Sequence, residues 1–234
     1  MINIKVIASG SSGNCTVAET TAGEKFLFDA GIAYSKIVRA AGYVDYAIIT
    51  HEHSDHAYKS TPTKLLENGT NLYMTKGTCK ALGLGTRHNL TILYAGIFTS
   101  YLRLGSCQLR ALKSRHDAAE PIVFQLYDGE DRVLYATDTK YIPEWIDEEN
   151  VFTKLVVEAN HFEKVLAASR ADEWHKMRVS ENHLSVERLR KYLIGLNKEK
   201  LKEVHLIHIS KRNGDGNKFR KIIGEIVNVP VFAY

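Results

Sequence analysis

The sequence of 234 residues is poor in the features that mark secreted, disulfide-built or membrane proteins. It has 3 cysteines and 4 prolines, and Cys15, Cys79 and Cys107 form no Cys-x-x-Cys pair. An odd, widely spaced set predicts free thiols in a reducing compartment and argues against a metal site built from cysteine. No apolar run approaches the roughly 18 residues that are needed to cross a bilayer.

Strong charge and targeting signals are also missing. Residues 1–7 indicate a β-strand and lack the basic start and long apolar stretch of a signal peptide, so we expect a cytoplasmic protein with no membrane association. The net charge of +4 is compatible with an anionic substrate without requiring one. The length and the hydrophobic content of 44% allow one large domain or two small ones, with a sizeable core.

What the chain does have is a cluster of three histidines and one aspartate in residues 51–56, His-Glu-His-Ser-Asp-His, directly after an apolar run. Because residues two apart on an extended backbone point the same way, His51 and His53 can bind one cation. If the chain then turns into a helix, Asp55 and His56 point toward a second. Imidazole with carboxylate favours zinc, manganese or iron over calcium or magnesium. The alternative is a polar loop whose side chains cap a helix.

The pattern of apolar residues predicts a mixed α/β fold of two halves, each with strands followed by helices. In the first half, strands are expected near residues 4–8, 15–18, 25–28, 46–50, 72–74, 90–93, 101–104 and 107–112, and helices near 35–41, 61–67 and 77–82. In the second half, strands are expected at 122–127, 132–136, 154–158, 204–207 and 229–234, and helices near 161–169, 185–196 and from about 217. This order predicts two sheets face to face with helices outside. Residues 9–13 indicate a tight turn that could also line a site.

Three more candidate ligands, His116, Asp138 and His208, each follow a predicted strand. Ligand sites on sheets collect at the carboxyl ends of strands. Each residue alone is a weak signal, because a lone histidine is more often structural and Asp138 could cap a turn. Together they complete donors for two cations, with Asp138 as the bridge. The first cation would take His51, His53 and His116, and the second would take Asp55, His56 and His208.

Several motifs in one order resemble those of metallo-β-lactamase-fold hydrolases over nearly the whole chain. The nearer resemblance is to the YycJ/WalJ-like branch, which includes phage-borne members and is related to the transfer-RNA 3′-processing endonucleases. The motifs are residues 8–14, 50–56, 116–121, 136–138, 158–161, 183–185 and 208–210. The resemblance implies a single domain spanning residues 1–234, a four-layer αβ/βα sandwich of the α/β (α+β) class, and the seven ligands above. The chain departs from this pattern at Phe162, where relatives usually carry an acidic residue, and at Asn182, where they carry glycine.

A dinuclear centre activates water and clamps the attacking and leaving oxygens, which suits phosphodiesters but also lactones and thioesters. Three features favour phosphodiesters: the missing secretion signal, a carboxy-terminal part that ends in a helix and strand of the sandwich, and Glu158 with His183. These two resemble a Glu–His pair of the transfer-RNA processing enzymes. The 70 positions from Asp138 to His208 leave no room for a large cap domain, and no long arm for transfer RNA is evident. DNA or single-stranded nucleic acid is therefore the favoured substrate.

The sequence thus predicts a dinuclear metal-dependent hydrolase, a phosphodiesterase or nuclease, with two zinc or manganese ions, or iron. A metal-bridging hydroxide would attack phosphorus, His183 would protonate the leaving oxygen, Glu158 would orient His183, and Asp55 would serve both as ligand and in catalysis. His183 could instead mark the entrance of a helix capped by Ser185. Two other functions stay open: a small-molecule metallohydrolase acting on a lactone, thioester or cyclic nucleotide, and a non-catalytic metal-binding protein.

Overall fold

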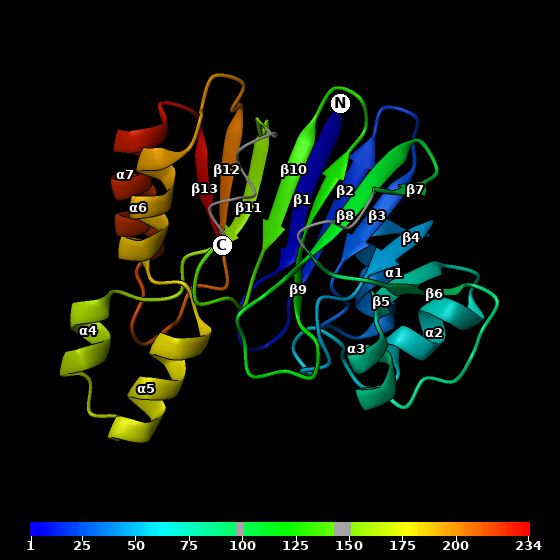
Figure 1. Ribbon diagram of the computed structural model, residues 1–234, viewed down its shortest axis with the longest axis horizontal. Coiled ribbons are helices and arrows are strands. Elements are labelled where there is room, and N and C mark those ends of the chain that lie inside the picture. Colours follow the sequence, from blue (N-terminus) through cyan, green and yellow to red (C-terminus); the bar gives the residue numbers. More distant parts are fainter. Residues whose placement is uncertain (97–100, 143–150) are drawn as a thin grey trace. The chain divides into compact units, whose positions relative to one another are not determined.

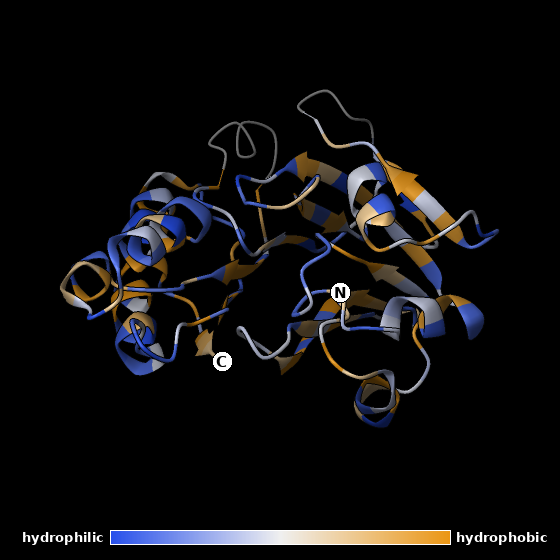
Figure 2. Ribbon diagram, turned by 90° about the horizontal axis from the view of Figure 1, so that it is seen from below, coloured by the Kyte–Doolittle hydropathy of each residue, from blue (hydrophilic) through white to orange (hydrophobic). Residues whose placement is uncertain are grey.

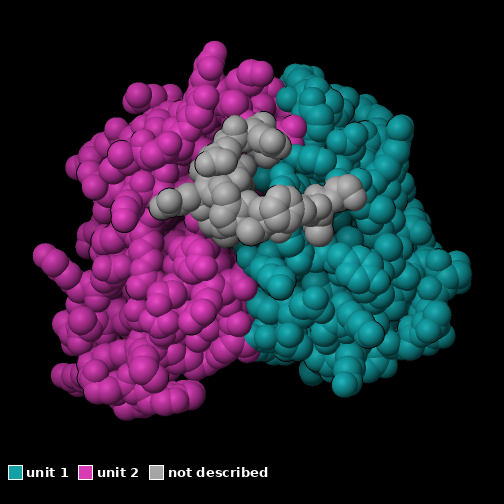
Figure 3. All heavy atoms as spheres, viewed as in Figure 1, with its two compact units in different colours: residues 1–113, 118–130 teal, residues 114–117, 131–234 magenta. Residues whose placement is uncertain are grey.

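The computed structural model of the chain describes residues 1–96, 101–142 and 151–234. The chain divides into two compact units (Figure 3). Unit 1 comprises residues 1–113 and 118–130, and unit 2 comprises residues 114–117 and 131–234. That the chain folds as a single domain over residues 1–234 stays a prediction.

Unit 1 is built on a six-stranded sheet in the order β1-β2-β3-β4-β5-β6. The strands are β1 (Ile2–Ala8), β2 (Cys15–Thr20), β3 (Lys25–Phe28), β4 (Tyr46–Ile48), β5 (Asn71–Thr75) and β6 (Leu90–Leu93). The pairs from β1 to β3 are antiparallel and those from β3 to β6 are parallel. The carboxyl ends of the parallel strands therefore share one edge of the sheet, where residues 50–56 follow β4.

Three helices, α1 (Tyr34–Ala41), α2 (Thr61–Glu67) and α3 (Lys76–Ala81), connect the parallel strands of unit 1. Ile37 of α1 and Leu65 of α2 are fully buried in the same core as Leu27 and Leu72 of the sheet. Unit 1 also contains an antiparallel group of strands, β7 (Leu102–Leu104), β8 (Cys107–Lys113) and β9 (Ile122–Tyr127). The ring of Phe28 meets that of Phe124 edge-on at 5.0 Å, so the two groups of strands share a core.

Unit 2 holds four parallel strands, β10 (Arg132–Ala136), β11 (Lys154–Glu158), β12 (Glu203–Ile207) and β13 (Val231–Ala233). Most side chains of β10, β11 and β12 are buried, as expected of a parallel sheet covered on both faces. Its helices are α4 (Glu163–Ala168), α5 (Glu173–Asn182), α6 (Val186–Gly195) and α7 (Gly216–Val227). Figure 1 shows α6 and α7 side by side, with α4 and α5 as a second pair.

Both units mix strands with helices, which confirms the predicted α/β class. Figure 2 shows orange and blue alternating around the helices, the pattern of elements with one buried face. In α7, for example, Phe219, Ile223 and Val227 are buried. Among the described residues, no helix combines the length and hydropathy that a membrane span needs.

α5 contradicts the prediction made from sequence, which placed no helix between residues 169 and 185. Val179 is the one buried residue of α5, so the sequence of this helix carries no apolar stripe. Asp172 was the available signal. Its side chain accepts a hydrogen bond from the backbone N–H of His175 at 2.8 Å, which is the geometry of an N-cap.

Candidate metal centre

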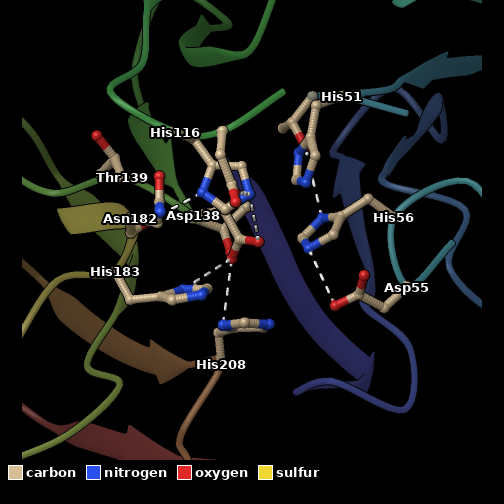
Figure 4. Close-up of polar contacts among 12 residues, drawn as sticks. His51, Asp55, His56, His116, Asp138, Thr139, Asn182, His183 and His208 are labelled. Atoms are coloured by element: carbon tan, nitrogen blue, oxygen red, sulfur yellow. Dashed lines mark hydrogen bonds and ion pairs between the residues drawn. The ribbon is translucent and has the colours of Figure 1, made fainter. Parts of the chain in front are cut away.

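In unit 1 the structure brings the four predicted ligands of residues 51–56 together. After β4 the backbone turns, and the N–H groups of residues 56 and 57 both donate to the carbonyl oxygen of His53 at 2.8 Å. The ring centroid of His51 lies 4.7 Å from that of His53 and 4.2 Å from that of His56. Nε2 of His56 lies 3.6 Å from a carboxylate oxygen of Asp55. Figure 4 shows His51, His56 and Asp55 along this segment.

Asp29, which the sequence analysis missed, organises these imidazoles. The carboxylate is fully buried, and Oδ1 accepts from both the backbone N–H and the hydroxyl of Thr50, each at 2.8 Å. Oδ2 accepts from Nδ1 of His56 at 2.8 Å. Because the hydroxyl proton of Thr50 points to Asp29, its oxygen accepts from Nδ1 of His51 at 3.0 Å. Both rings thus carry a proton on Nδ1 and present Nε2 unprotonated, the form in which histidine binds metal.

The glycine-rich turn at residues 9–14 also packs against this segment. Asn14 is buried, and its amide nitrogen donates to the carbonyl oxygen of Asp55 at 3.2 Å and lies 3.0 Å from Nε2 of His56. The approach is close enough to require glycine at position 31, where a Cβ atom would lie 1.7 Å from the carbonyl oxygen of Asp55. The predicted tight turn therefore also supports the histidine cluster.

In unit 2, Asp138, Glu158 and His208 gather at the ends of three neighbouring parallel strands. Ala136 of β10 pairs with Val157 of β11, and Glu158 pairs with Ile207 of β12, so the residues that follow lie at one edge. Nδ1 of His208 lies 2.8 Å from Oε1 of Glu158 and 3.1 Å from Oδ1 of Asp138.

Two further histidines of unit 2 join this group. Nε2 of His116 lies 3.5 Å from Oδ2 of Asp138, while its Nδ1–H donates to the carbonyl oxygen of Asn182 at 3.1 Å. The backbone of Asn182 makes this contact, so the departure from glycine at that position does not remove it. His183, the C-cap of α5, lies with Nδ1 2.7 Å from Oε1 of Glu158. The rings of His183 and His208 both lie beside Asp138 in Figure 4.

Backbone strain coincides with these residues. Asp29, Asp138 and His208 have φ values of 60°, 47° and 54°, in the left-handed region that disfavours side chains. Such a conformation costs about 1–3 kcal/mol and persists only where the surrounding structure enforces it, most often at functional sites. The strain therefore supports a functional role for the carboxylates and the imidazole at these strand ends.

The protonation states in unit 2 follow from burial and from the charges nearby. Burial would raise the pKa of Glu158, but His183 and His208 outweigh burial and lower it to about 2, so the carboxylate is ionised. Burial lowers the pKa of His183, yet Glu158 and Asp138 raise it above its ordinary value. Burial lowers the pKa of His116 despite Asp138, so this ring is neutral at pH 7.

The donor set fits divalent transition-metal ions. In unit 2, Asp138, Glu158, His183 and His208 each offer one ligand atom within 4.8 Å of the others. Hydrogen bonds from Nδ1 leave Nε2 of His51, His56 and His116 as the coordinating nitrogen, the usual arrangement around a metal-binding histidine. The roles of the individual residues remain proposals.

The cysteines fit this picture. All three thiols are free. Burial raises the pKa of Cys15 to about 12 and that of Cys107 to about 11, so both are protonated. Because metals bind the thiolate, neither thiol is a good ligand.

Comparison with known proteins places these observations in a family. Residues 25–209 match the Beta-lactamase superfamily domain. Exodeoxyribonuclease WalJ of Streptococcus pneumoniae is 29% identical over 225 residues, which cover 89% of this chain and 81% of that protein. Exodeoxyribonuclease YycJ of Bacillus anthracis is 23% identical over 250 residues, covering 99% of this chain and 91% of that protein.

Solved structures show the same fold. YhfI from Bacillus subtilis, a metallo-β-lactamase fold protein, superposes with a TM-score of 0.76 at 18% identity, covering 100% of this chain and 96% of that one. The short form of human tRNase Z gives a TM-score of 0.63 at 12% identity, covering 91% and 94%. The predicted resemblance and the predicted αβ/βα sandwich are thereby confirmed. The chain belongs to the β-lactamase superfamily and is a hydrolase of the metallo-β-lactamase fold.

Proposed function

We propose that the protein is a metal-dependent nuclease that hydrolyses phosphodiester bonds of DNA. The observation that carries this proposal is the pairing of His183 with the buried Glu158 next to Asp138 and His208, because it supplies a positioned proton donor beside a metal-binding group. The relatives named exodeoxyribonucleases support DNA as the substrate. The free thiols support a cytoplasmic location.

The proposed cofactor is a pair of divalent transition-metal ions, zinc or manganese, with iron as a third candidate. When bound, two such ions supply an activated water at neutral pH and neutralise charge on the phosphate. Seven residues would hold the ions: His51, His53 and His116 the first, Asp55, His56 and His208 the second, and Asp138 both.

Around the ions, the chain's own residues position the reacting groups. The carboxylate of Glu158 accepts from Nδ1 of both His183 and His208, and its second oxygen accepts from the backbone N–H of Leu184 at 3.0 Å. This network fixes the His183 ring and leaves Nε2 as the atom that can hold a proton for the leaving oxygen. Asp55, whose side chain is 20% exposed, is accessible enough to orient the attacking water as well as to bind metal.

A panel of metals and substrates tests the proposal. Purified protein is loaded with zinc or manganese and incubated with end-labelled single- and double-stranded DNA and RNA, and with lactone and thioester probes. We expect metal-dependent shortening of DNA, with weaker substrate binding as salt rises, because each neutralised phosphate releases counterions. Efficient lactone or thioester hydrolysis with every nucleic acid intact would replace the proposal with a small-molecule hydrolase.

A further inference from the structure

Unit 2 contains a cavity that none of the predicted metal ligands line. Its volume is about 380 Å³, and its walls come from α4, α5, α6 and His161, two residues before α4. Ligand pockets range from about 300 to 1,000 Å³, so this one suits a single small group. Leu166, Ala167 and Met177 provide apolar wall, while His161, Ser180 and Arg188 provide polar groups.

The charges on the cavity wall cancel. The guanidinium of Arg188 donates to the carbonyl oxygen of Ser180 at 2.7 Å, and its Nε lies 3.4 Å from a carboxylate oxygen of Glu163. The ammonium of Lys176 lies 2.9 Å from a carboxylate oxygen of Glu173. A phosphate placed here would meet two carboxylates as well as two cations, so the wall favours an uncharged ligand over an anion.

His161 gives the wall a hydrogen-bond acceptor. The residue is 1% exposed, and burial lowers its pKa to about 4, so the ring is neutral at pH 7. The side-chain nitrogen of Asn160 donates to the carbonyl oxygen of His208 at 2.9 Å. The side-chain oxygen of Asn160 therefore faces His161 and lies 3.2 Å from its Nδ1. That oxygen can only accept, so Nδ1 carries the proton and Nε2 is the acceptor. An acceptor, a hydroxyl, a planar guanidinium and apolar side chains are the groups with which proteins bind an unstacked nucleobase.

Residues of the cavity wall are linked to the proposed reaction site within unit 2 by one helix and by hydrogen bonds. Ser180 lines the cavity, and His183 caps the same helix three residues later, about 4.5 Å further along the axis. On the other side, Asn160 contacts both His161 of the cavity and His208 of the site. A group bound in the cavity would therefore lie close to the leaving-group side of the reaction.

We propose that this cavity holds one unpaired nucleobase of the strand that is cleaved, so that the substrate is a single strand or an unpaired strand end. The inference rests on the nuclease function proposed above. A base inside a duplex cannot enter a cavity between helices unless it leaves the stack. Trp174, 67% exposed on α5, adds a ring on which a neighbouring base can stack.

Two tryptophan substitutions on α4 distinguish the effect of filling the cavity from the effect of adding a large side chain elsewhere on the helix. Ala167 lines the cavity, and Ala167→Trp would occupy it. Val165 lies on the same helix, is 45% exposed and is not part of the wall, so Val165→Trp adds a larger ring outside the cavity as the matched control. Met177→Trp, at a wall position that is 59% exposed, is the second filling variant if Ala167→Trp fails to fold.

The probe is a single-stranded oligodeoxynucleotide that carries 2-aminopurine at successive positions, bound in the presence of a chelator so that no cleavage occurs. With wild type and Val165→Trp, we expect a change in emission at one position, where the base leaves its stack. Ala167→Trp should lose this change and raise the KM for cleavage about tenfold or more, the loss expected from one stacked base, with metal content unchanged. An abasic nucleotide at that position should abolish the difference between the variants.

The failures are distinguishable. If wild type cleaves the oligonucleotide, but Ala167→Trp and Val165→Trp bind and cleave it equally well, the cavity assignment is wrong and the nuclease function stands. If wild type cleaves no nucleic acid, the function proposed above is wrong. Titration with free 2-aminopurine deoxyriboside then decides the cavity by itself, since binding must be lost in Ala167→Trp and kept in Val165→Trp.

Discussion

The two halves of the predicted ligand set are encoded in different ways. In unit 1, four donors lie within residues 51–56, after one strand. In unit 2, His116, Asp138 and His208 are spread over 93 positions and meet where neighbouring strands end. The first half is visible from spacing alone, because its four donors lie within six residues, and the segment brings them together by bends and turns rather than as the extended chain that the sequence suggested. The second depends on the register of parallel strands, which spacing does not reveal.

The halves also differ in how their rings are supported. In unit 1, Asp29 binds His56 directly and reaches His51 through the hydroxyl of Thr50. In unit 2, a single oxygen of Glu158 accepts from both His183 and His208. The hydrogen bonds to Glu158 in unit 2 therefore link a proposed ligand to the proposed proton donor, whereas the hydrogen bonds to Asp29 in unit 1 hold proposed ligands alone. Changes in the two units should accordingly have different signatures.

The largest effect is expected from Asp138→Ala, because this carboxylate is the proposed shared ligand. Metal content measured by elemental analysis should fall from two ions to at most one. Cleavage should fall by about 10³-fold or more, since metal ions contribute several kcal/mol to transition-state stabilisation. Glu203→Ala is the control, because that carboxylate pairs with Lys154 at the start of β12. Unchanged metal content in Asp138→Ala would contradict the bridging assignment.

His183→Ala separates catalysis from metal binding within unit 2. Loss of a general acid lowers the rate by about 10²–10⁴-fold, and both metal ions should remain. A nitrophenyl phosphodiester needs little protonation of its leaving group, so its hydrolysis should be much less affected. His175→Ala, on the same helix, is the control. Equal losses on both substrates would indicate positioning or binding, and an unchanged rate would leave His183 as a helix-end residue.

Asp29→Asn tests whether support in unit 1 serves metal binding alone. The amide cannot replace the charge that holds Nδ1–H of His56, so metal affinity should fall by about 10–100-fold, while the rate at saturating metal stays within a few-fold of wild type. Asp45→Asn is the control, since Asp45 accepts from the backbone N–H of Lys25. Glu158→Gln in unit 2 should instead lower both the metal affinity and the rate at saturating metal. Identical behaviour of the Asp29 and Glu158 variants would remove the contrast between the units.

The smallest effect concerns His161, on the cavity wall of unit 2. Its pKa is about 4 in the folded chain against an ordinary value of 6.5, so the fold favours the neutral ring. The resulting stability is present above about pH 6.5 and is lost as the pH falls toward 4, because the unfolded chain takes up the proton first. Between pH 7 and pH 5.5 this loss amounts to about 1 kcal/mol. Urea unfolding of metal-free protein should show a correspondingly smaller loss in His161→Gln, and equal losses would contradict the assignment.

Much of the fold could be read from sequence because its strands are apolar and its helices mostly amphipathic. The exception is α5, whose side chains mainly face solvent or the cavity, so that only the Asp172 cap marks it. Asp29 was missed although it follows the apolar strand β3, the same signal that identified Asp138 and His208. It stands alone between a strand and a glycine-containing turn, where an aspartate is most often a turn residue.

The amino-acid sequence alone sets the chemical kinds of donor and the spacing of His51, His53, Asp55 and His56, because these follow from covalent order within one short segment. Tertiary structure decided which nitrogen each imidazole presents and which rings share Glu158. Those properties depend on hydrogen-bond partners that are distant along the chain, such as Asn182 for His116. The tautomer of a histidine is set by its partner, and the partner is known only once the strands and helices are in register.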